Sequence, residues 1–488
     1  MKNVEHERLI KVISKYPINM RLKLLETIGK KRYNVFYPEN ILPSRKTNDL
    51  YNYELELIAM LSVVTDNKAN YPVIPNERRW LYDAVNVIRG QNYLSPLFES
   101  VGALGAITGI LFMQSQGQKI YSNLYYRYDF IYNYANENIN MVEIFMSFFG
   151  VKFQSFLDLC FLTATYKEFD KANGLKWFYS RLSDDLKTAF HHLLIDRNGF
   201  KELYNQISRN HEIYSFFDLN LLLKYPFIEY NENIYCPWFP YIPYACTENL
   251  MFIITKDDND LRSLIGKNVI EAYVFNLFDK TEYSKNLKKH REIIYGKEHH
   301  HTSDIILSKD NHVLLVEIKF MNQSLKLRDL SEIEIDTFSE RLAKGFAQLT
   351  KNIHSFVDGE FNEKLDIKCS SAKGILLTYD SYYFHREKIY NKAISILESE
   401  GIITTLDDLK SKVLLMSLTN LESILTRIDD DFITYTDSLF KLPTSWLDMH
   451  YGTDEYAPEI DGIPDIEEHL NKLLDRFQEN LENLIKLQ

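Results

Sequence analysis

Residues 303–320 read SDIILSKDNHVLLVEIKF, which is two apolar runs separated by the turn-forming pair Asp310-Asn311. The second run is apolar on both faces over most of its length, and this predicts a buried central strand. Asp304 lies six residues before the turn pair, and Glu317 lies six residues after it. An antiparallel hairpin with this turn therefore brings the two carboxyl groups opposite each other. The stretch predicts a buried hairpin with acidic side chains at its open end.

Lys319 joins Glu317 on one face of the second strand, because side chains two residues apart point the same way. Charges on a buried strand are costly unless they are paired or bound to a metal ion. Neighbouring carboxylates repel each other, and a hard cation such as Mg²⁺ relieves that repulsion with one or two carboxylates, water and phosphate oxygens as ligands. The alternative is that Asp304 simply opens a strand and that Glu317 and Lys319 form an exposed cross-strand charge set.

The elements on either side of the hairpin alternate between helix and strand. The periodicity and the turn residues predict helix, strand, strand, strand, helix and strand in that order, followed by another strand and a helical end. Thr337 to Glu340 form a Thr-x-x-Glu capping box that is expected to open the second helix. The expected ranges are 261–279 for the first helix, 292–295, 303–307 and 312–320 for the strands, 337–357 for the second helix, and 374–379 and 412–417 for the last strands.

The segment from about 261 to 425 resembles the PD-(D/E)xK, or restriction-endonuclease-like, nuclease superfamily. The motifs that carry the resemblance are Ser303-Asp304 and Glu317-Ile318-Lys319, with Ser303 where the family name has proline. The resemblance implies that Asp304 and Glu317, with the Ile318 carbonyl, bind Mg²⁺ or Mn²⁺. It also implies that Lys319 assists the attacking water.

Two flanking residues extend the resemblance. Glu271, at the end of the sequence GKNVIE, resembles the helical glutamate that completes the metal site; the alternative is a surface glutamate. Gln348 resembles the glutamine of RecB-like members, although Asn352 stands where those members have tyrosine. Lys344 shares a helical stripe with Gln348 that suits phosphate contact, and the alternative is an ordinary solvated helix face.

A basic run precedes the hairpin. Lys288, Lys289 and Arg291 are expected to bind the DNA backbone, although charge runs are more often simply solvated. The triplet His299 to His301 is expected to be a solvated loop and not a zinc site, since consecutive residues do not easily reach one ion and no Cys-x-x-Cys accompanies them.

The fold class expected for the whole chain is α+β and multidomain. A mostly α-helical N-terminal region precedes a restriction-endonuclease-like α/β core, and a helical acidic tail follows it. The expected segments are 1–205, helical, for regulation or recognition; 206–260, an aromatic-rich strand or hairpin connector; 261–425, the nuclease domain; and 426–488, the acidic C-terminal helical tail.

The charge of the chain is concentrated at one end. The 488 residues include 68 acidic and 56 basic side chains, a formal charge of −12, which excludes a protein whose whole surface attracts nucleic acid. From Asn420 onward there are 16 acidic and 5 basic residues, so nearly all of the negative charge lies there. Two hypotheses for this tail are a solubilising outer helix and a segment that covers the basic approach to the site or docks a partner.

The function expected from these features is that of a Mg²⁺-dependent deoxyribonuclease, an endonuclease in preference to an exonuclease, in anti-phage defence or restriction. The alternatives are an RNA-directed nuclease and a non-cleaving nucleic-acid-binding or scaffold protein with a nuclease-like fold. Besides DNA, a regulatory partner or a second copy of the chain is expected to bind through the N-terminal region or the acidic tail. The absence of a secretion signal and of a long apolar run predicts a cytoplasmic protein without a membrane partner.

Overall fold

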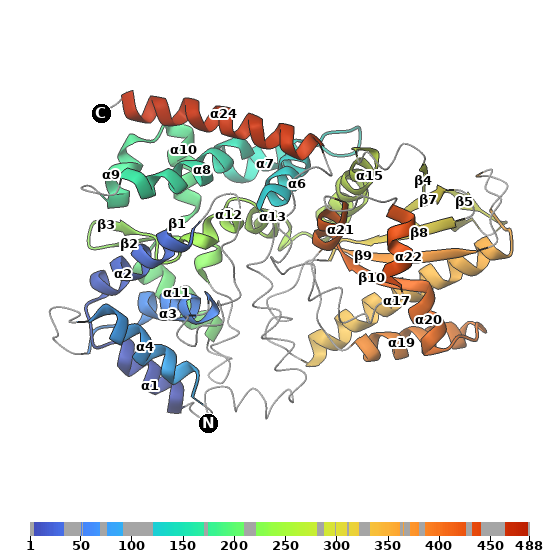
Figure 1. The fold of residues 1–488 in the computed structure, drawn as a ribbon, viewed down its shortest axis with the longest axis horizontal. Coiled ribbons are helices and arrows are strands. Elements are labelled where there is room, and N and C mark those ends of the chain that lie inside the picture. Colours follow the sequence, from blue (N-terminus) through green and yellow to red (C-terminus); the bar gives the residue numbers. More distant parts are fainter. Residues whose placement is uncertain are drawn as a thin grey trace. The chain divides into compact units, whose positions relative to one another are not determined.

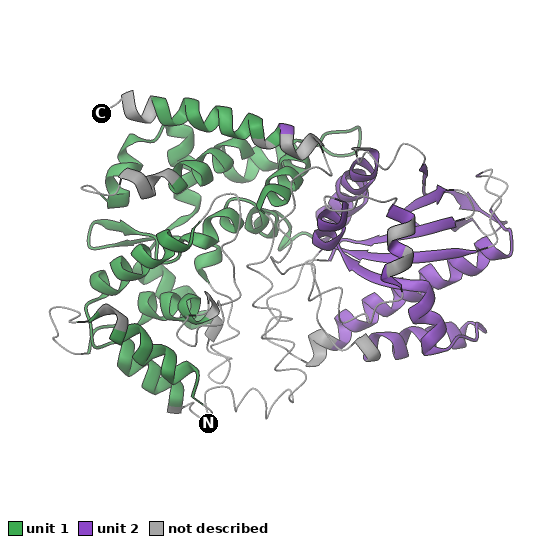
Figure 2. Cartoon of the chain, viewed as in Figure 1, with its two compact units in different colours: residues 1–258, 469–488 green, residues 259–468 purple. Residues whose placement is uncertain are grey.

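The computed structural model describes most of the chain. The described residues are 4–33, 50, 52–68, 76–90, 121–169, 174–208, 221–280, 287–297, 299–309, 312–321, 332–361, 365, 371–379, 386–425, 432–440 and 464–486. They form two compact units, drawn in different colours in Figure 2. Unit 1 contains residues 1–258 and 469–488, and unit 2 contains residues 259–468. The expected segments 1–205 and 206–260 fall in unit 1 except for the last two residues, and the expected tail 426–488 is divided between the units.

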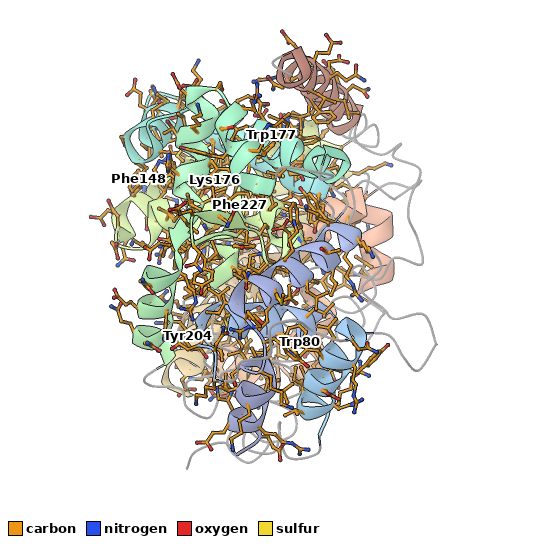
Figure 3. All side chains as sticks on the ribbon, turned by 90° about the vertical axis from the view of Figure 1, so that its left-hand side faces the viewer. Trp80, Phe148, Lys176, Trp177, Tyr204 and Phe227 are labelled. Carbon is orange, nitrogen blue, oxygen red and sulfur yellow. The ribbon has the colours of Figure 1, made fainter. Side chains whose placement is uncertain are left out.

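Unit 1 is mainly helical. The helices before residue 210 are α1 (Val4–Ile13), α2 (Ile18–Arg32), α3 (Asn52–Val64), α4 (Glu77–Ile88), α6 (Tyr121–Asn133), α7 (Met141–Phe149), α8 (Phe153–Phe169), α9 (Gly174–Arg181), α10 (Asp184–His192) and α11 (Arg197–Ser208). Aromatic side chains fill much of the space between them. Phe227 stacks on Phe190 with ring centroids 4.2 Å apart, and the Trp80 indole N–H donates to the Val12 carbonyl at 3.3 Å. Figure 3 labels Phe227 and Trp80 among the side chains of this unit.

The connector between the helical region and unit 2 is a hairpin followed by helices. The strands are β1 (Leu194–Asp196), β2 (Phe227–Tyr230) and β3 (Asn233–Tyr235), and β2 pairs with β3 in antiparallel fashion as predicted. The prediction of a strand or hairpin connector over 206–260 is wrong for the part after β3, because η2 (Phe239–Tyr241), α12 (Ile242–Ala245) and α13 (Glu248–Thr255) are helical. Pro240 and Pro243 occupy the first turns of η2 and α12, where a missing N–H costs nothing.

The last helix, α24 (Pro464–Lys486), contacts helices of unit 1 from His469 onward. His469 Nε2 lies 3.1 Å from Asp129 Oδ2 on α6, and Arg476 Nη2 lies 3.0 Å from Asp158 Oδ2 on α8. The Phe477 ring packs 6.2 Å from that of Phe161. These contacts attach the end of the acidic tail to α6 and α8.

No single helix of the described residues is long and apolar enough to cross a membrane. One pair, α7 with the first part of α8, meets the length and composition test only when the two are taken together, and the pair is bent by 63°.

Unit 2 is built on a five-stranded sheet in the order β10-β9-β8-β7-β4 (Figure 1). Its strands are β4 (Lys288–Arg291), β7 (Ile305–Lys309), β8 (His312–Lys319), β9 (Ala372–Thr378) and β10 (Val413–Ser417). The pairs β4·β7 and β7·β8 are antiparallel, and β8·β9 and β9·β10 are parallel. The two short strands β5 (Ile294–Tyr295) and β6 (His300–His301) form a separate ladder. The mixed α+β class is confirmed.

The described helices of unit 2 are α14 (Asn259–Ile265), the π-helical turn η3 (Gly266–Ile270), α15 (Glu271–Lys280), α17 (Glu332–Val357), α19 (Arg386–Ser399), α20 (Leu406–Lys412), α21 (Leu418–Leu425) and α22 (Phe432–Leu439). Of these, α17, α20, α21 and α22 pack on strands of the sheet. Helix α17 lies against β8 and β9 and carries α19 beside it. Close approach of α17 to β9 requires a glycine, since a Cβ at Gly374 would lie 2.6 Å from Leu349 Cγ.

Three sequence expectations for unit 2 need correction. The helix predicted at 261–279 contains the π-helical turn η3 in its middle. Helix α17 begins at Glu332 and not at Thr337, so the expected capping box lies inside it. Within this helix, Asp336 is paired with Lys388 of α19 at 2.5 Å.

The first strand of the sheet also differs from the prediction, which placed it at 292–295. The sheet strand is β4 at 288–291, within the basic run, whereas the range 292–295 contributes only β5 to the small ladder. Strand β4 lies at the edge of the sheet, a place where lysine is favoured because it hinders pairing with another chain.

Candidate active site

The predicted hairpin is present and has the predicted register. Ile305 pairs with Val316, which places Asp304 and Glu317 next to each other at the open end of β7 and β8. Asp304 Oδ2 accepts a hydrogen bond from the backbone N–H of Ile318 at 2.6 Å. The turn pair Asp310-Asn311 lies outside the described residues. The convergence of the two carboxyl groups is therefore confirmed.

Lys319 forms an ion pair with Glu317 at this strand end. Lys319 Nζ donates to Glu317 Oε1 at 2.7 Å, and the Glu317 side chain is 3% exposed. The other oxygen, Glu317 Oε2, is buried, and no group in the described part of the chain donates a hydrogen bond to it. A buried carboxylate oxygen without a donor is costly, so a ligand that reaches Oε2 would stabilise the site.

Burial, together with neighbouring carboxylates, raises the pKa of the acidic groups at the strand end. Burial raises the pKa of Asp304 to about 7, and the neighbouring Glu317 carboxylate adds to that shift. Burial also raises the pKa of Glu317, while the Lys319 ammonium lowers it. One lysine thus does not compensate the charge that these groups carry when ionised, and the site favours a further cation.

Glu271 is the first residue of α15 and follows η3 directly. Burial raises its pKa to about 8, and the Asp304 carboxylate is the next largest cause. The π-helical turn seats Gly266 against the residue after Lys319, since a Cβ there would lie 3.0 Å from Phe320 Cβ. Turns of this kind recur at functional sites because they change the face on which the next residues lie. The structure thus brings Glu271 into the electrostatic neighbourhood of Asp304.

The carboxyl groups do not form a preassembled cage. Among the described residues, no three His, Cys, Asp or Glu side chains are arranged so that they could share one metal ion. The predicted ligand set Asp304, Glu317 and Glu271 is therefore not gathered around a single point. Asp304 and Glu317 alone supply two carboxylates, which is the number that a Mg²⁺ site completed by water and phosphate oxygens typically has.

Glu292 is a fourth acidic residue of the site and was missed by the sequence reasoning. Its carboxylate raises the pKa of Asp304, Glu317 and Glu271. Its backbone N–H donates to the Asp304 carbonyl at 3.1 Å, and its Oε1 lies 3.0 Å from His301 Nδ1. The antiparallel pairing of Arg291 with Ile305 brings the residue after Arg291 level with Asp304. Had the strand been placed within the basic run, this register would have revealed Glu292.

Helix α17 brings Gln348 to the site. Gln348 Oε1 accepts a hydrogen bond from Lys319 Nζ at 3.4 Å, so Lys319 is held between β8 and α17. The lysine stem passes close to the helix at Gly345, where a Cβ would lie 3.3 Å from Lys319 Cε and 2.8 Å from Leu376 Cδ1. A side chain at residue 345 would therefore push against the residue that places the ammonium group.

We expect Gly345→Ala to destabilise the protein although alanine is the better helix former. The preference for alanine contributes about 1 kcal/mol, but overpacking a buried contact costs about 1–3 kcal/mol. The net change in the free energy of unfolding should be a loss of about 1 kcal/mol, measured by urea denaturation. A gain of about 1 kcal/mol, as at an unobstructed helical glycine, would contradict the close packing of α17 on Lys319 and Leu376.

The predicted DNA-binding residues lie on strand β4 and on helix α17. Lys289 is paired with Asp279 at the end of α15, and the Arg291 guanidinium lies 4.5 Å from the Phe275 ring centroid. Lys288 is exposed on β4, and Lys344 is exposed on α17, where it pairs with Glu340 at 2.8 Å. Lys289 is thus half-buried against α15, whereas Lys288, Arg291 and Lys344 are exposed, with Arg291 also packed on Phe275.

The histidine triplet is exposed, as predicted, but it is not a plain loop. His300 and His301 form β6, and the His300 ring lies 5.7 Å from that of Tyr295. His301 pairs with Glu292, which connects the triplet to the acidic cluster.

Comparison of the chain with protein-family models, with curated proteins and with solved structures finds no match.

Proposed function

We propose that unit 2 is a Mg²⁺- or Mn²⁺-dependent nuclease that hydrolyses phosphodiester bonds in DNA. The observation that carries the proposal is the buried Glu317 Oε2 without a donor, next to Asp304 and within an ion pair with Lys319. This combination fits a metal ion better than it fits a purely structural ion pair, because a structural pair satisfies its buried oxygens.

The residues that would hold the ion are Asp304 and Glu317, with the Ile318 carbonyl as the third protein ligand. A bound divalent ion supplies an acidified water and offsets the negative charge that develops on the phosphate. Asp304 keeps one oxygen on the Ile318 N–H, which orients its carboxylate along the strand end. Glu317 is fixed in the same way by Lys319.

Lys319 is the residue that would bind the phosphate or orient the attacking water. Its ammonium group has three donors, and Glu317 Oε1 and Gln348 Oε1 accept two of them. The remaining donor can hold a phosphate oxygen or the attacking water. Gln348, on α17, orients Lys319. Glu271 and Glu292 would act through bound water and through the negative charge that they add near Asp304 and Glu317.

Exposed basic groups at the edges of unit 2 would attract the nucleic-acid backbone. Lys288, Arg291 and Lys344 are the predicted phosphate contacts that are exposed. Positive side chains near phosphate contribute affinity that is independent of base sequence and that falls with salt. We therefore propose DNA binding of low sequence specificity through these residues.

The experiment is a cleavage assay on a covalently closed plasmid, single-stranded DNA and RNA, with Mg²⁺, Mn²⁺ or chelator. We expect the wild type to nick the closed circle only when one of the metal ions is present, because a circle has no ends for an exonuclease. Asp304→Ala and Lys319→Ala should not cut. Cleavage of RNA alone would assign the site to RNA. No cleavage of any substrate, or equal cleavage by the variants, would reject the proposed mechanism and favour a non-cleaving binding protein.

A further inference from the structure

The segment before Asp304 is buried, although it lies outside the large sheet. Thr302 is 1% exposed and Ser303 is fully buried. On one side, the segment pairs with Ile293. The Thr302 N–H donates to the Ile293 carbonyl at 3.0 Å, and Thr302 Oγ1 accepts from the Ile293 N–H at 2.9 Å. The other side of the segment needs partners of its own, since buried backbone groups are almost always hydrogen bonded.

Asn352 of α17 supplies those partners. Its side chain is buried, with 4% of the residue exposed. With the amide oriented to satisfy its neighbours, the nitrogen donates to the His301 carbonyl at 3.2 Å. The amide oxygen then accepts from the Ser303 N–H at 3.1 Å and from the Ser303 hydroxyl at 3.2 Å. One side chain thus makes three hydrogen bonds to the two residues that flank Thr302.

These three hydrogen bonds affect Asp304 because Ser303 directly precedes it in the chain. The Asp304 carboxylate is held on one side by the Ile318 N–H, but it carries like charges from Glu317 and Glu292 as neighbours. The position of the backbone directly before Asp304 determines where this carboxyl group lies relative to Glu317. The Asn352 amide fixes that backbone because it accepts a hydrogen bond from the N–H of Ser303, the residue directly before Asp304.

We propose that Asn352 is a positioning residue that holds Asp304 in the geometry needed for metal binding, a role that rests on the proposed function. It acts through Ser303 and touches neither the metal ligands nor the substrate. Partners that orient the ligands of a metal ion typically change metal affinity or activity by about 10–100-fold when they are removed.

The test compares Asn352→Ala with Thr350→Ala. Thr350 is also buried on α17, but its hydroxyl donates to the Phe346 carbonyl of its own helix. Both changes delete a buried polar side chain from the same helix, so they control for simple loss of stability. Ser303→Ala, which removes one of the three bonds, should give an intermediate result.

We expect Asn352→Ala to weaken Mn²⁺ binding by about 10–100-fold in isothermal titration and to lower kcat on plasmid by a similar factor. The KM for DNA should stay within about twofold, since Asn352 does not touch the nucleic acid. Thr350→Ala should change the Mn²⁺ affinity and kcat by less than about threefold. Equal losses in the two variants would overturn the positioning role and leave only a structural one.

Hydrogen exchange separates this inference from the proposed function. Peptides that cover residues 299–305 should exchange faster in Asn352→Ala and at the wild-type rate in Thr350→Ala. Unchanged exchange in these peptides would overturn the inference. If the wild type binds Mn²⁺ but cuts no nucleic acid, the proposed function fails, and the exchange and Mn²⁺ results still decide whether Asn352 positions Asp304.

Discussion

We expect Lys319→Met to lower kcat for plasmid cleavage by about 10³-fold or more. Methionine keeps the apolar stem next to Gly345 but removes the ammonium group that Glu317 and Gln348 bind. Two losses combine. No donor remains for the water or the phosphate, and the pKa of Glu317 rises further because Lys319 is the group that lowers it.

The matched control is Lys351→Met on the same helix as Gln348. Lys351 pairs with Glu400 at 2.8 Å and is 41% exposed, and we place it outside the site. This variant should keep kcat within about threefold of the wild type, since exposed ion pairs contribute about 1 kcal/mol or less. Initial rates at saturating DNA and Mg²⁺ measure both effects. A Lys319→Met enzyme that cuts at the rate of Lys351→Met would remove lysine from the mechanism.

Asp304→Asn makes the metal-free protein more stable at pH 8 and abolishes its stabilisation by Mg²⁺. The pKa of Asp304 is about 7 and that of Glu271 about 8 in the folded state, whereas unfolded carboxyl groups titrate near 4. Between about pH 4 and pH 8 the folded state therefore binds more protons than the unfolded state. Stability from these groups is present below about pH 4 and is lost as the pH rises through 7 and 8.

The measurement is thermal unfolding at pH 5 and pH 8, with and without Mg²⁺. The wild type should lose more stability between these pH values than Asp304→Asn, which has no proton to lose at this position. Mg²⁺ should stabilise the wild type more at pH 8 than at pH 5, because the metal must displace protons from its ligands. Metal binding should be absent in the variant because an amide replaces the carboxylate.

Asp336→Asn is the control for these pH effects. Asp336 is exposed on α17, and its pKa is lowered by Lys388, so it is already ionised throughout the range from pH 5 to pH 8. The control should show the same pH slope and the same response to Mg²⁺ as the wild type. If Asp304→Asn also keeps the wild-type slope and the wild-type response, the carboxylate at residue 304 does not bind the ion.

The hairpin was predictable from sequence because its determinants are local. The turn pair and the period of the apolar residues set the register, and that register brings Asp304 and Glu317 together. The parallel strands β9 and β10 were also predictable, since short apolar runs between helices are typical of buried strands.

The rest depends on contacts between residues that are distant in sequence. Strand β4 was hidden within a charged run, because its Lys289 and Arg291 are accommodated by Asp279 and Phe275 of α15. Glu292 was missed for the same reason. Asn352 looked like a departure from a motif, and its role is visible only once α17 is placed beside the segment before Asp304.

The attachment of the acidic tail could not be predicted either. The negative charge from Asn420 onward suggested either a solubilising outer helix or a segment that covers the basic approach to the site or docks a partner. The contacts that attach the last helix join His469 and Arg476 to aspartates on α6 and α8, more than 300 residues away in sequence. The net charge thus predicted that the tail is acidic, but it did not predict that Asp129 and Asp158 bind its last helix.

The most direct test of a metal-dependent nuclease at this site is nicking of closed circular DNA. The assay compares the wild type with Glu317→Gln, in Mg²⁺ and in chelator. Glutamine keeps the size of the side chain and a hydrogen bond to Lys319, but it lacks the second carboxylate oxygen that has no donor in the described structure. We predict nicking by the wild type in Mg²⁺ only, and none by Glu317→Gln. Nicking that survives the chelator, or that Glu317→Gln performs as well as the wild type, would contradict a metal-dependent nuclease at this site.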